Sequence, residues 1–175
     1  MHQKLPKEID PLRLAQNGLK LEGQLPIAGM LRLSKSLQSD EGWVNVKLGF
    51  DVDEVGTPYM RGKFNTSVSV ICERCMNSMA LEMNVDCLLA MVNSERKVEG
   101  LAEQYDPWII ENNDPVLLSA VIEDELILSL PLVPRHADAC LPEEAWSVGD
   151  QHVELKDSDK AASPFAVLSA LKIKQ

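Results

Sequence analysis

Alternating apolar and polar positions in the middle of the chain predict an antiparallel sheet. From 43 to 53 the apolar side chains take every second position, and the same period of two recurs from 79 to 92. This period gives a strand one apolar face and one face toward water. Segments 59–64 and 66–72 are predicted as two further strands and 19–25 as another. The sheet is therefore the main element expected.

Outside these strands the pattern is less regular. Segment 30–37 fits either a helix or a strand, and 105–110 is predicted as a short strand. Polar residues from 94 to 106 predict a loop. Asp10 and Pro11 are a typical cap and first residue of a helix, which would run to 16 and end at Gly18.

The pattern changes to a helical period after residue 114. Apolar residues recur there at steps of three and four, at Leu118, Val121, Ile122, Leu126 and Leu130. Asp114 and Pro115 are predicted to begin this long helix, and Pro131 to end it. The run Glu123, Asp124, Glu125 is predicted to be a solvent-exposed edge of the helix, with an acidic ridge for a partner as the alternative. Together the elements predict an α+β fold, mainly an antiparallel β-sheet, open or barrel-like, with one long helix and short terminal helices.

The last part of the chain has a different composition. Six acids stand against Lys156 and Lys160 between 141 and 163, which predicts an acidic flexible linker. Residues 164–175 are predicted as a C-terminal amphipathic helix with partner-binding side chains, namely Phe165, Leu168 and Leu171. A helix this short is marginal alone, so it must dock on its own domain or on a partner. Residues 1–140 are then the single α+β domain, including the CxxC hairpin.

Composition limits the classes of protein to which the chain can belong. The chain has 175 residues with 17 basic and 27 acidic side chains, a net charge of 17 − 27 = −10. This acidic balance argues against broad electrostatic capture of nucleic acid, although a local basic contact remains compatible with it. Arg61, Lys63 and Arg74 lie on or beside the predicted sheet and are candidates for such a patch, together with Lys172 and Lys174. We expect no membrane span and no secretory signal, hence reduced thiols in the cytoplasm.

The four cysteines predict a metal site and one core residue. Cys72 and Cys75 fall between two predicted strands, so a hairpin tip carries both thiols. His136 and Cys140 supply a second pair, which completes the four ligands of a closed, structural zinc ion. The alternatives are unligated thiols or a redox pair, although a redox CxxC is typical of a helix N-terminus. Cys87 has the register of a strand's apolar face and is predicted to pack as a small hydrophobe.

Several segments, taken in order, resemble one protein family. They are IDPLRLAQ at 9–16, CERC at 72–75, EDELIL and LPLVP between 123 and 134, and SPFAVL at 163–168. The set resembles the YceD proteins of bacteria and plastids, the large ribosomal RNA subunit accumulation proteins. By this resemblance Cys72 and Cys75 match the family's cysteine pair. His136 and Cys140 fall where relatives carry a further Cys or His cluster.

The resemblance implies a non-enzymatic function in the synthesis, processing or stability of 23S rRNA and in large-subunit assembly. Because the chain is acidic, we expect it to act as a protein adaptor that binds an assembly protein or a basic ribosomal protein, with no small-molecule substrate. The alternatives are a direct rRNA-binding protein and a CxxC thiol redox enzyme. No catalytic residue follows from the resemblance.

Overall fold

The computed structural model describes residues 5–110 and 114–142 of the chain. The chain divides into two units, Met1–Cys140 and Leu141–Gln175. All helices and strands below belong to the first unit. The predicted linker, apart from 141 and 142, and the predicted terminal helix with Phe165, Leu168 and Leu171 lie outside the described residues.

A five-stranded sheet forms the centre of the first unit. Its strands stand in the order β2 (Lys20–Pro26), β3 (Trp43–Val52), β4 (Pro58–Ile71), β5 (Ser78–Val92) and β6 (Asp106–Ile109). Neighbouring strands are antiparallel except β5 and β6, which are parallel. Among the described strands, β2 and β6 are the two edges, so the sheet is open. The predicted α+β fold with a mainly antiparallel sheet is confirmed.

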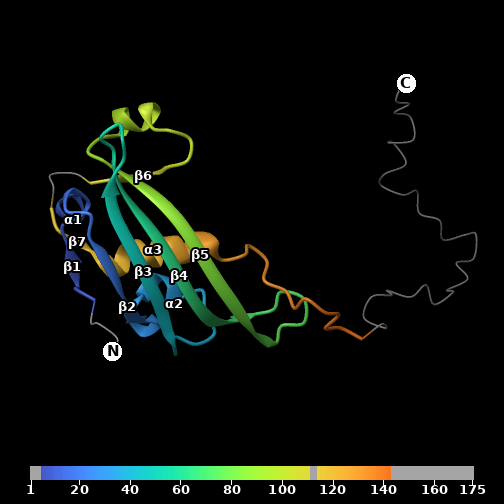
Figure 1. Ribbon diagram of the computed structural model, residues 1–175. Coiled ribbons are helices and arrows are strands. Elements are labelled where there is room, and N and C mark those ends of the chain that lie inside the picture. Colours follow the sequence, from blue (N-terminus) through green and yellow to red (C-terminus); the bar gives the residue numbers. More distant parts are fainter. Residues whose placement is uncertain (1–4, 111–113, 143–175) are drawn as a thin grey trace, which may run out of the picture. The chain divides into compact units, whose positions relative to one another are not determined.

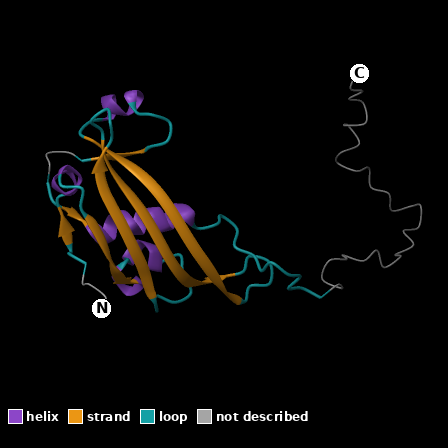
Figure 2. Ribbon diagram, viewed as in Figure 1, coloured by secondary structure: helices purple, strands orange, loops and turns teal. Residues whose placement is uncertain are grey.

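The helices cover one face of this sheet. Figure 2 shows α3 (Leu118–Ser129) behind the long strands, with α2 (Leu31–Ser34) on the same side. The face toward α3 carries the core, in which Val44, Val46, Phe50 and Phe64 are almost wholly buried. The outward-facing residues of β3 to β5 are largely polar and exposed, as the period of two requires. One face is therefore dry and the other is open to solvent.

Short elements complete the unit. Asp10 caps α1 (Pro11–Gln16) as predicted, since its Oδ1 accepts the backbone N–H of Arg13 at 3.0 Å. A two-stranded sheet pairs β1 (Glu8–Ile9) with β7 (Val116–Leu117). The ambiguous segment 30–37 contains a helix, α2 (Leu31–Ser34), which follows the 3₁₀ turn η1 (Ile27–Gly29). Within the two described ranges, no helix is long and apolar enough to cross a membrane.

Two predicted boundaries are wrong, and one predicted loop contains a short helix. The strands expected at 59–64 and 66–72 are one strand, β4, because Asn65 pairs with both Asn45 and Asn84 and the register continues through it. The long helix begins at Leu118, because 116 and 117 form strand β7 and leave Asp114 and Pro115 outside the helix. The predicted loop contains a 3₁₀ helix, η2 (Glu95–Gly100). In the first two cases strand pairing overrides the local signal.

Glu123 corrects the prediction of a solvent-exposed edge on α3. Its side chain is buried, and its Oε1 accepts the backbone N–H groups of Arg32 at 2.6 Å and Leu33 at 3.0 Å. These donors belong to the first turn of α2, where no intrahelical partner exists. The Arg32 guanidinium also forms an ion pair with Glu123 at 3.0 Å. A carboxylate from α3 thus caps α2 and fixes it against α3.

Candidate metal centre

The hairpin between β4 and β5 positions the first two cysteines. Cys72 directly follows β4, and its backbone N–H donates to the carbonyl of Asn77 at 2.9 Å. The N–H of Met76 donates back to the carbonyl of Cys72 at 2.8 Å. Met76 has φ 59, a left-handed conformation that is uncommon outside glycine. This tight turn folds Cys75 back toward Cys72.

The segment that follows α3 supplies the other two side chains. After Ser129 ends the helix, the chain passes the hairpin tip, and the N–H of Glu73 donates to the carbonyl of Pro134 at 2.9 Å. The Arg74 guanidinium donates to the carbonyls of Asp138 at 3.1 Å and His136 at 3.5 Å. The hairpin therefore holds 134–140 through its own backbone and through one arginine.

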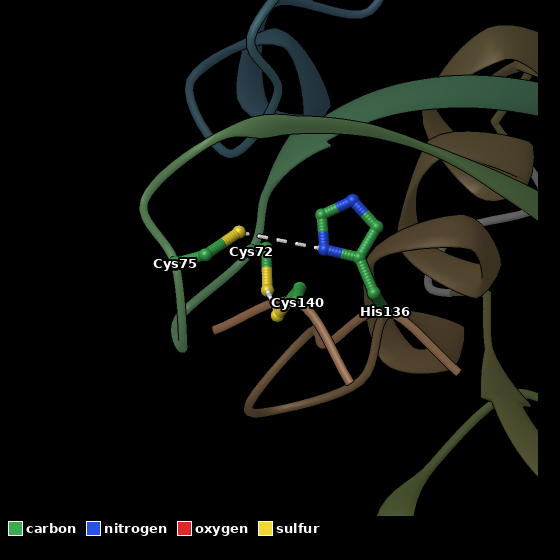
Figure 3. Close-up of side chains that lie close together, drawn as sticks. All are labelled: Cys72, Cys75, His136 and Cys140. Atoms are coloured by element: carbon green, nitrogen blue, oxygen red, sulfur yellow. Dashed lines mark hydrogen bonds between the residues drawn. The ribbon is translucent and has the colours of Figure 1, made fainter. Parts of the chain in front are cut away.

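The four predicted ligands converge on one point. Figure 3 shows Cys72, Cys75, His136 and Cys140 directed toward a common centre from the hairpin and from the segment after α3. Their ligand atoms all lie within 4.8 Å of one another. The Cys72 and Cys140 sulfurs are 3.8 Å apart, and Cys75 Sγ is 3.5 Å from His136 Nδ1. The fold thus joins two pairs that are far apart in the sequence.

These separations fit a tetrahedral zinc ion. At Zn–S distances of about 2.3 Å and a tetrahedral angle, two sulfurs lie about 3.8 Å apart and a sulfur and a nitrogen about 3.6 Å apart. Two contacts of the cluster, at 3.8 Å and 3.5 Å, have these lengths. A disulfide is excluded at 3.8 Å, because its sulfurs would be about 2 Å apart. The donor set of three thiols and one imidazole is that of a Cys₃His site.

The surroundings of Cys72 favour its thiolate form. Burial, the largest single influence, opposes ionisation, but backbone N–H groups of Cys75, His136 and Arg74 lower the pKa of the thiol to about 5. Burial and the neighbouring thiols instead raise the pKa of Cys140. Opposite shifts are expected where sulfurs crowd one site, because each thiolate disfavours the next. A divalent cation would remove this conflict by stabilising every thiolate at once.

The remaining sequence predictions have separate outcomes. Cys87 is buried in the core, and burial raises the pKa of its thiol to about 12, so the prediction of a small hydrophobe is confirmed. Arg61 and Lys63 lie on the sheet, whereas Arg74 binds carbonyls beside the cluster. The positioning role of Arg74 was missed. No sequence signal could have found it, because its partners are backbone atoms more than 60 residues away.

Comparison with known proteins places the chain in a family. The family model of the large ribosomal RNA subunit accumulation protein YceD matches residues 60–172, a range that includes all four clustered residues. A YceD protein of Haemophilus influenzae is 30% identical over 175 residues, covering 98% of each chain. No solved structure matches the chain. The sequence resemblance is thereby confirmed, and the chain belongs to the YceD family of large ribosomal RNA subunit accumulation proteins.

Proposed function

We propose that this protein supports the accumulation of 23S rRNA, and hence large-subunit assembly, without catalysing a reaction. One observation carries the proposal: the relative described as a large ribosomal RNA subunit accumulation protein is similar over 98% of this chain. A similarity of this extent includes the domain, the cluster and the tail together. The proposed location is the cytoplasm, where ribosomal subunits are assembled.

Within this function the Cys/His cluster is proposed to hold one structural zinc ion. Cys72, Cys75, His136 and Cys140 would fill all four positions of a tetrahedron and leave none for water or substrate. Such an ion would join the β4–β5 hairpin to the segment after α3. Its contribution would be structural, and a closed site is not expected to catalyse hydrolysis.

A redox function is less well supported than a structural one. A low thiol pKa alone would suit either function. However, Cys72 is fully buried, and the CxxC lies in a turn between antiparallel strands rather than at a helix N-terminus. A redox thiol must meet its partner disulfide, which a buried sulfur does poorly. The Cys72 thiol is therefore better assigned as a metal ligand than as a redox group.

The proposed route to 23S rRNA is capture of a protein partner through the tail. Residues 141–163 are acidic, which favours encounter with a basic ribosomal protein or an assembly protein. An amphipathic segment at 164–175 would then insert its apolar side chains into a groove of that partner. Those side chains are Phe165, Leu168 and Leu171.

Deletion of the gene, followed by complementation with the wild-type or a variant chain, tests the function. In cells that lack the protein, the ratio of 23S to 16S rRNA is expected to fall, and the wild-type chain should restore it. The F165A/L168A/L171A variant should fold but fail both to rescue and to co-purify assembly proteins. The S169A/Q175A variant, altered on the same segment, is the control and should rescue. A normal 23S to 16S ratio without the protein would refute the function.

A further inference from the structure

The sheet face opposite the helices carries a group of cations in an otherwise acidic chain. Lys20 of β2, Lys47 of β3, and Arg61 and Lys63 of β4 line one shallow groove of about 450 Å³. Glu22 is the sole acid in the lining, so the groove has a charge of 4 − 1 = +3. The chain as a whole has a net charge of −10. A locally cationic surface is thus set into a chain that is acidic as a whole.

Two of these cations are not neutralised by neighbours. Lys47 pairs with Glu22 and Lys63 pairs with Asp86, each at 2.9 Å, in one row across four strands. Within the described part of the chain, Lys20 and Arg61 have no ion pair. These two occupy the adjacent cross-strand row, with Gly49 between them. The uncompensated charge is therefore concentrated around Gly49.

Gly49 leaves the backbone of β3 uncovered inside the groove. A Cβ at this position would meet no atom within 4 Å, so the space above the glycine is open. Every other residue in its row has a side chain, and the gap lies between two cations. An anionic group of the size of a phosphate could enter this gap and contact both.

The rest of the face suits nucleobases. Beside the ionic row, amides from four strands form a second row, in which Gln24 Nε2 donates to Asn45 Oδ1 at 2.7 Å and Asn65 Nδ2 donates to Asn84 Oδ1 at 2.6 Å. Trp43 follows on the same face of β3 and is 58% exposed. An exposed indole on a polar sheet is a stacking platform for an unpaired base.

We propose that this face, defined by Lys20, Lys47, Arg61, Lys63 and Trp43, binds a short single-stranded segment of RNA. The cations contact phosphates around Gly49, and one base stacks on Trp43. An acidic peptide would use the cations but would have no base to stack on the indole, and duplex RNA hides its base faces. The inference rests on the proposed function insofar as the natural RNA is ribosomal, and it adds an RNA contact to the protein contact made by the tail.

The proposal can be tested by fluorescence anisotropy. The full-length chain is titrated into a labelled 12-nucleotide single-stranded RNA of mixed sequence. The K20E/R61E variant is expected to bind at least about tenfold more weakly, because two phosphate contacts become repulsive. The W43A variant should bind the RNA about fivefold or more weakly, because the stacking contact alone is lost. For the wild type, a plot of the logarithm of the binding constant against the logarithm of the salt concentration should have a slope of about −1.4 to −2.8. This range corresponds to about 0.7 per phosphate for two to four phosphate contacts.

The matched control is K35E/K97E, which makes the same change in charge at two exposed lysines outside the groove. It should change affinity less than about twofold, as expected for distant screened charges. Far-ultraviolet circular dichroism and thermal melting establish that each variant is folded. Equal weakening by the control, equal binding of duplex RNA, or full competition by a polyglutamate peptide would each overturn the proposal.

The outcomes also separate this proposal from the proposed function. If deletion of the protein lowers 23S rRNA while K20E/R61E binds RNA as the wild type does, the RNA surface is refuted and the function stands. If the groove variants lose RNA binding but deletion leaves 23S rRNA unchanged, the surface stands and the function fails.

Discussion

Two junctions tie the segment from α3 to Cys140 to distant parts of the domain, and they use different chemistry. At the first, Glu123 of α3 meets the Arg32 guanidinium and the backbone of α2. At the second, His136 and Cys140 meet the thiols of the β4–β5 hairpin. Figure 1 shows the hairpin and the segment after α3 at the same end of the sheet.

The two junctions differ in whether they need a component that the chain itself does not supply. The carboxylate of Glu123 finds its counter-charge and its N–H donors within the chain, so this junction is complete once the chain folds. The Cys/His junction brings three thiols and an imidazole together, and the hairpin supplies hydrogen bonds and the single positive charge of Arg74, which is too little to neutralise three thiolates. Its proposed stability therefore depends on a metal, whereas that of the first junction depends on pH.

Removal of the metal should have the largest effect. We expect chelation of the purified protein, or the C72S substitution, to lower the free energy of unfolding by about 4 kcal/mol at free zinc about 1,000-fold above its dissociation constant. Urea titration with and without chelator measures the loss, and metal analysis gives the stoichiometry. C87A is the control, since it removes a buried thiol that is not a ligand, and it should keep one zinc per chain. A chelator-insensitive midpoint would contradict the prediction.

Loss of the Glu123 carboxylate should be the next largest effect. The E123A variant leaves the backbone N–H groups of Arg32 and Leu33 without their acceptor, which is expected to destabilise the domain by about 3 kcal/mol, while the Arg32 guanidinium keeps its ion pair with Asp124. Urea unfolding measures the change, and metal content should be unaltered. D124A is the comparison variant, because it removes the exposed ion pair of Asp124 with the same Arg32 guanidinium but no buried hydrogen bond, with an expected loss below about 1 kcal/mol. Equal losses in the two variants would show that burial of Glu123 is unimportant.

Acid should weaken the first junction through the same residue. Although burial opposes ionisation of Glu123, the backbone N–H groups of Leu33 and Arg32 and the Arg32 side chain hold its pKa below the ordinary 4.5. The ionised form therefore stabilises the fold at all pH values above about 4.5, and this stabilisation is lost as pH falls through the folded-state pKa. The stability difference between wild type and E123Q should shrink below pH 4.5. A difference independent of pH from 7 to 3 would disprove this linkage.

The smallest effect is expected at Arg74, which orients the second junction without being a ligand. The R74M variant loses donors to the carbonyls of Asp138 and His136, with an expected loss of about 1 kcal/mol. Zinc transfer to a chromophoric chelator should become several-fold faster, because the segment with His136 and Cys140 opens more often. The R96M variant, at an exposed arginine of η2, should match the wild type in both measurements.

Local patterns predicted much of this molecule. The period of two located β3 and β5, and it placed Cys87 in the core, since alternate residues of a strand face opposite sides. Asp10 and Pro11 located α1, because capping depends on a few adjacent residues. The steps of three and four on α3 correctly identified Leu118, Val121, Ile122 and Leu126 as buried. In each of these cases the sequence signal and the structure that it predicts lie within one helix or one strand.

The failures share a different physical origin. Asn65 looked like a break between strands, but pairing on both sides with β3 and β5 carries β4 straight through it. Asp114 and Pro115 looked like a helix start, but β1 pairs with the two residues before the helix. Glu123 looked exposed, because nothing near it in sequence reveals that α2 presents unsatisfied N–H groups to α3.

By itself, then, the sequence determined the long strands, the helices α1 and α3, their apolar faces and the identity of the four metal-ligand candidates, since these depend on side-chain chemistry and short-range spacing. Only the tertiary structure decided that Cys72 lies 3.8 Å from Cys140, that Glu123 caps α2, and that four cations share one groove. Those relations join residues from different strands and helices. Their distances are set by strand register and by helix packing, which no local pattern encodes.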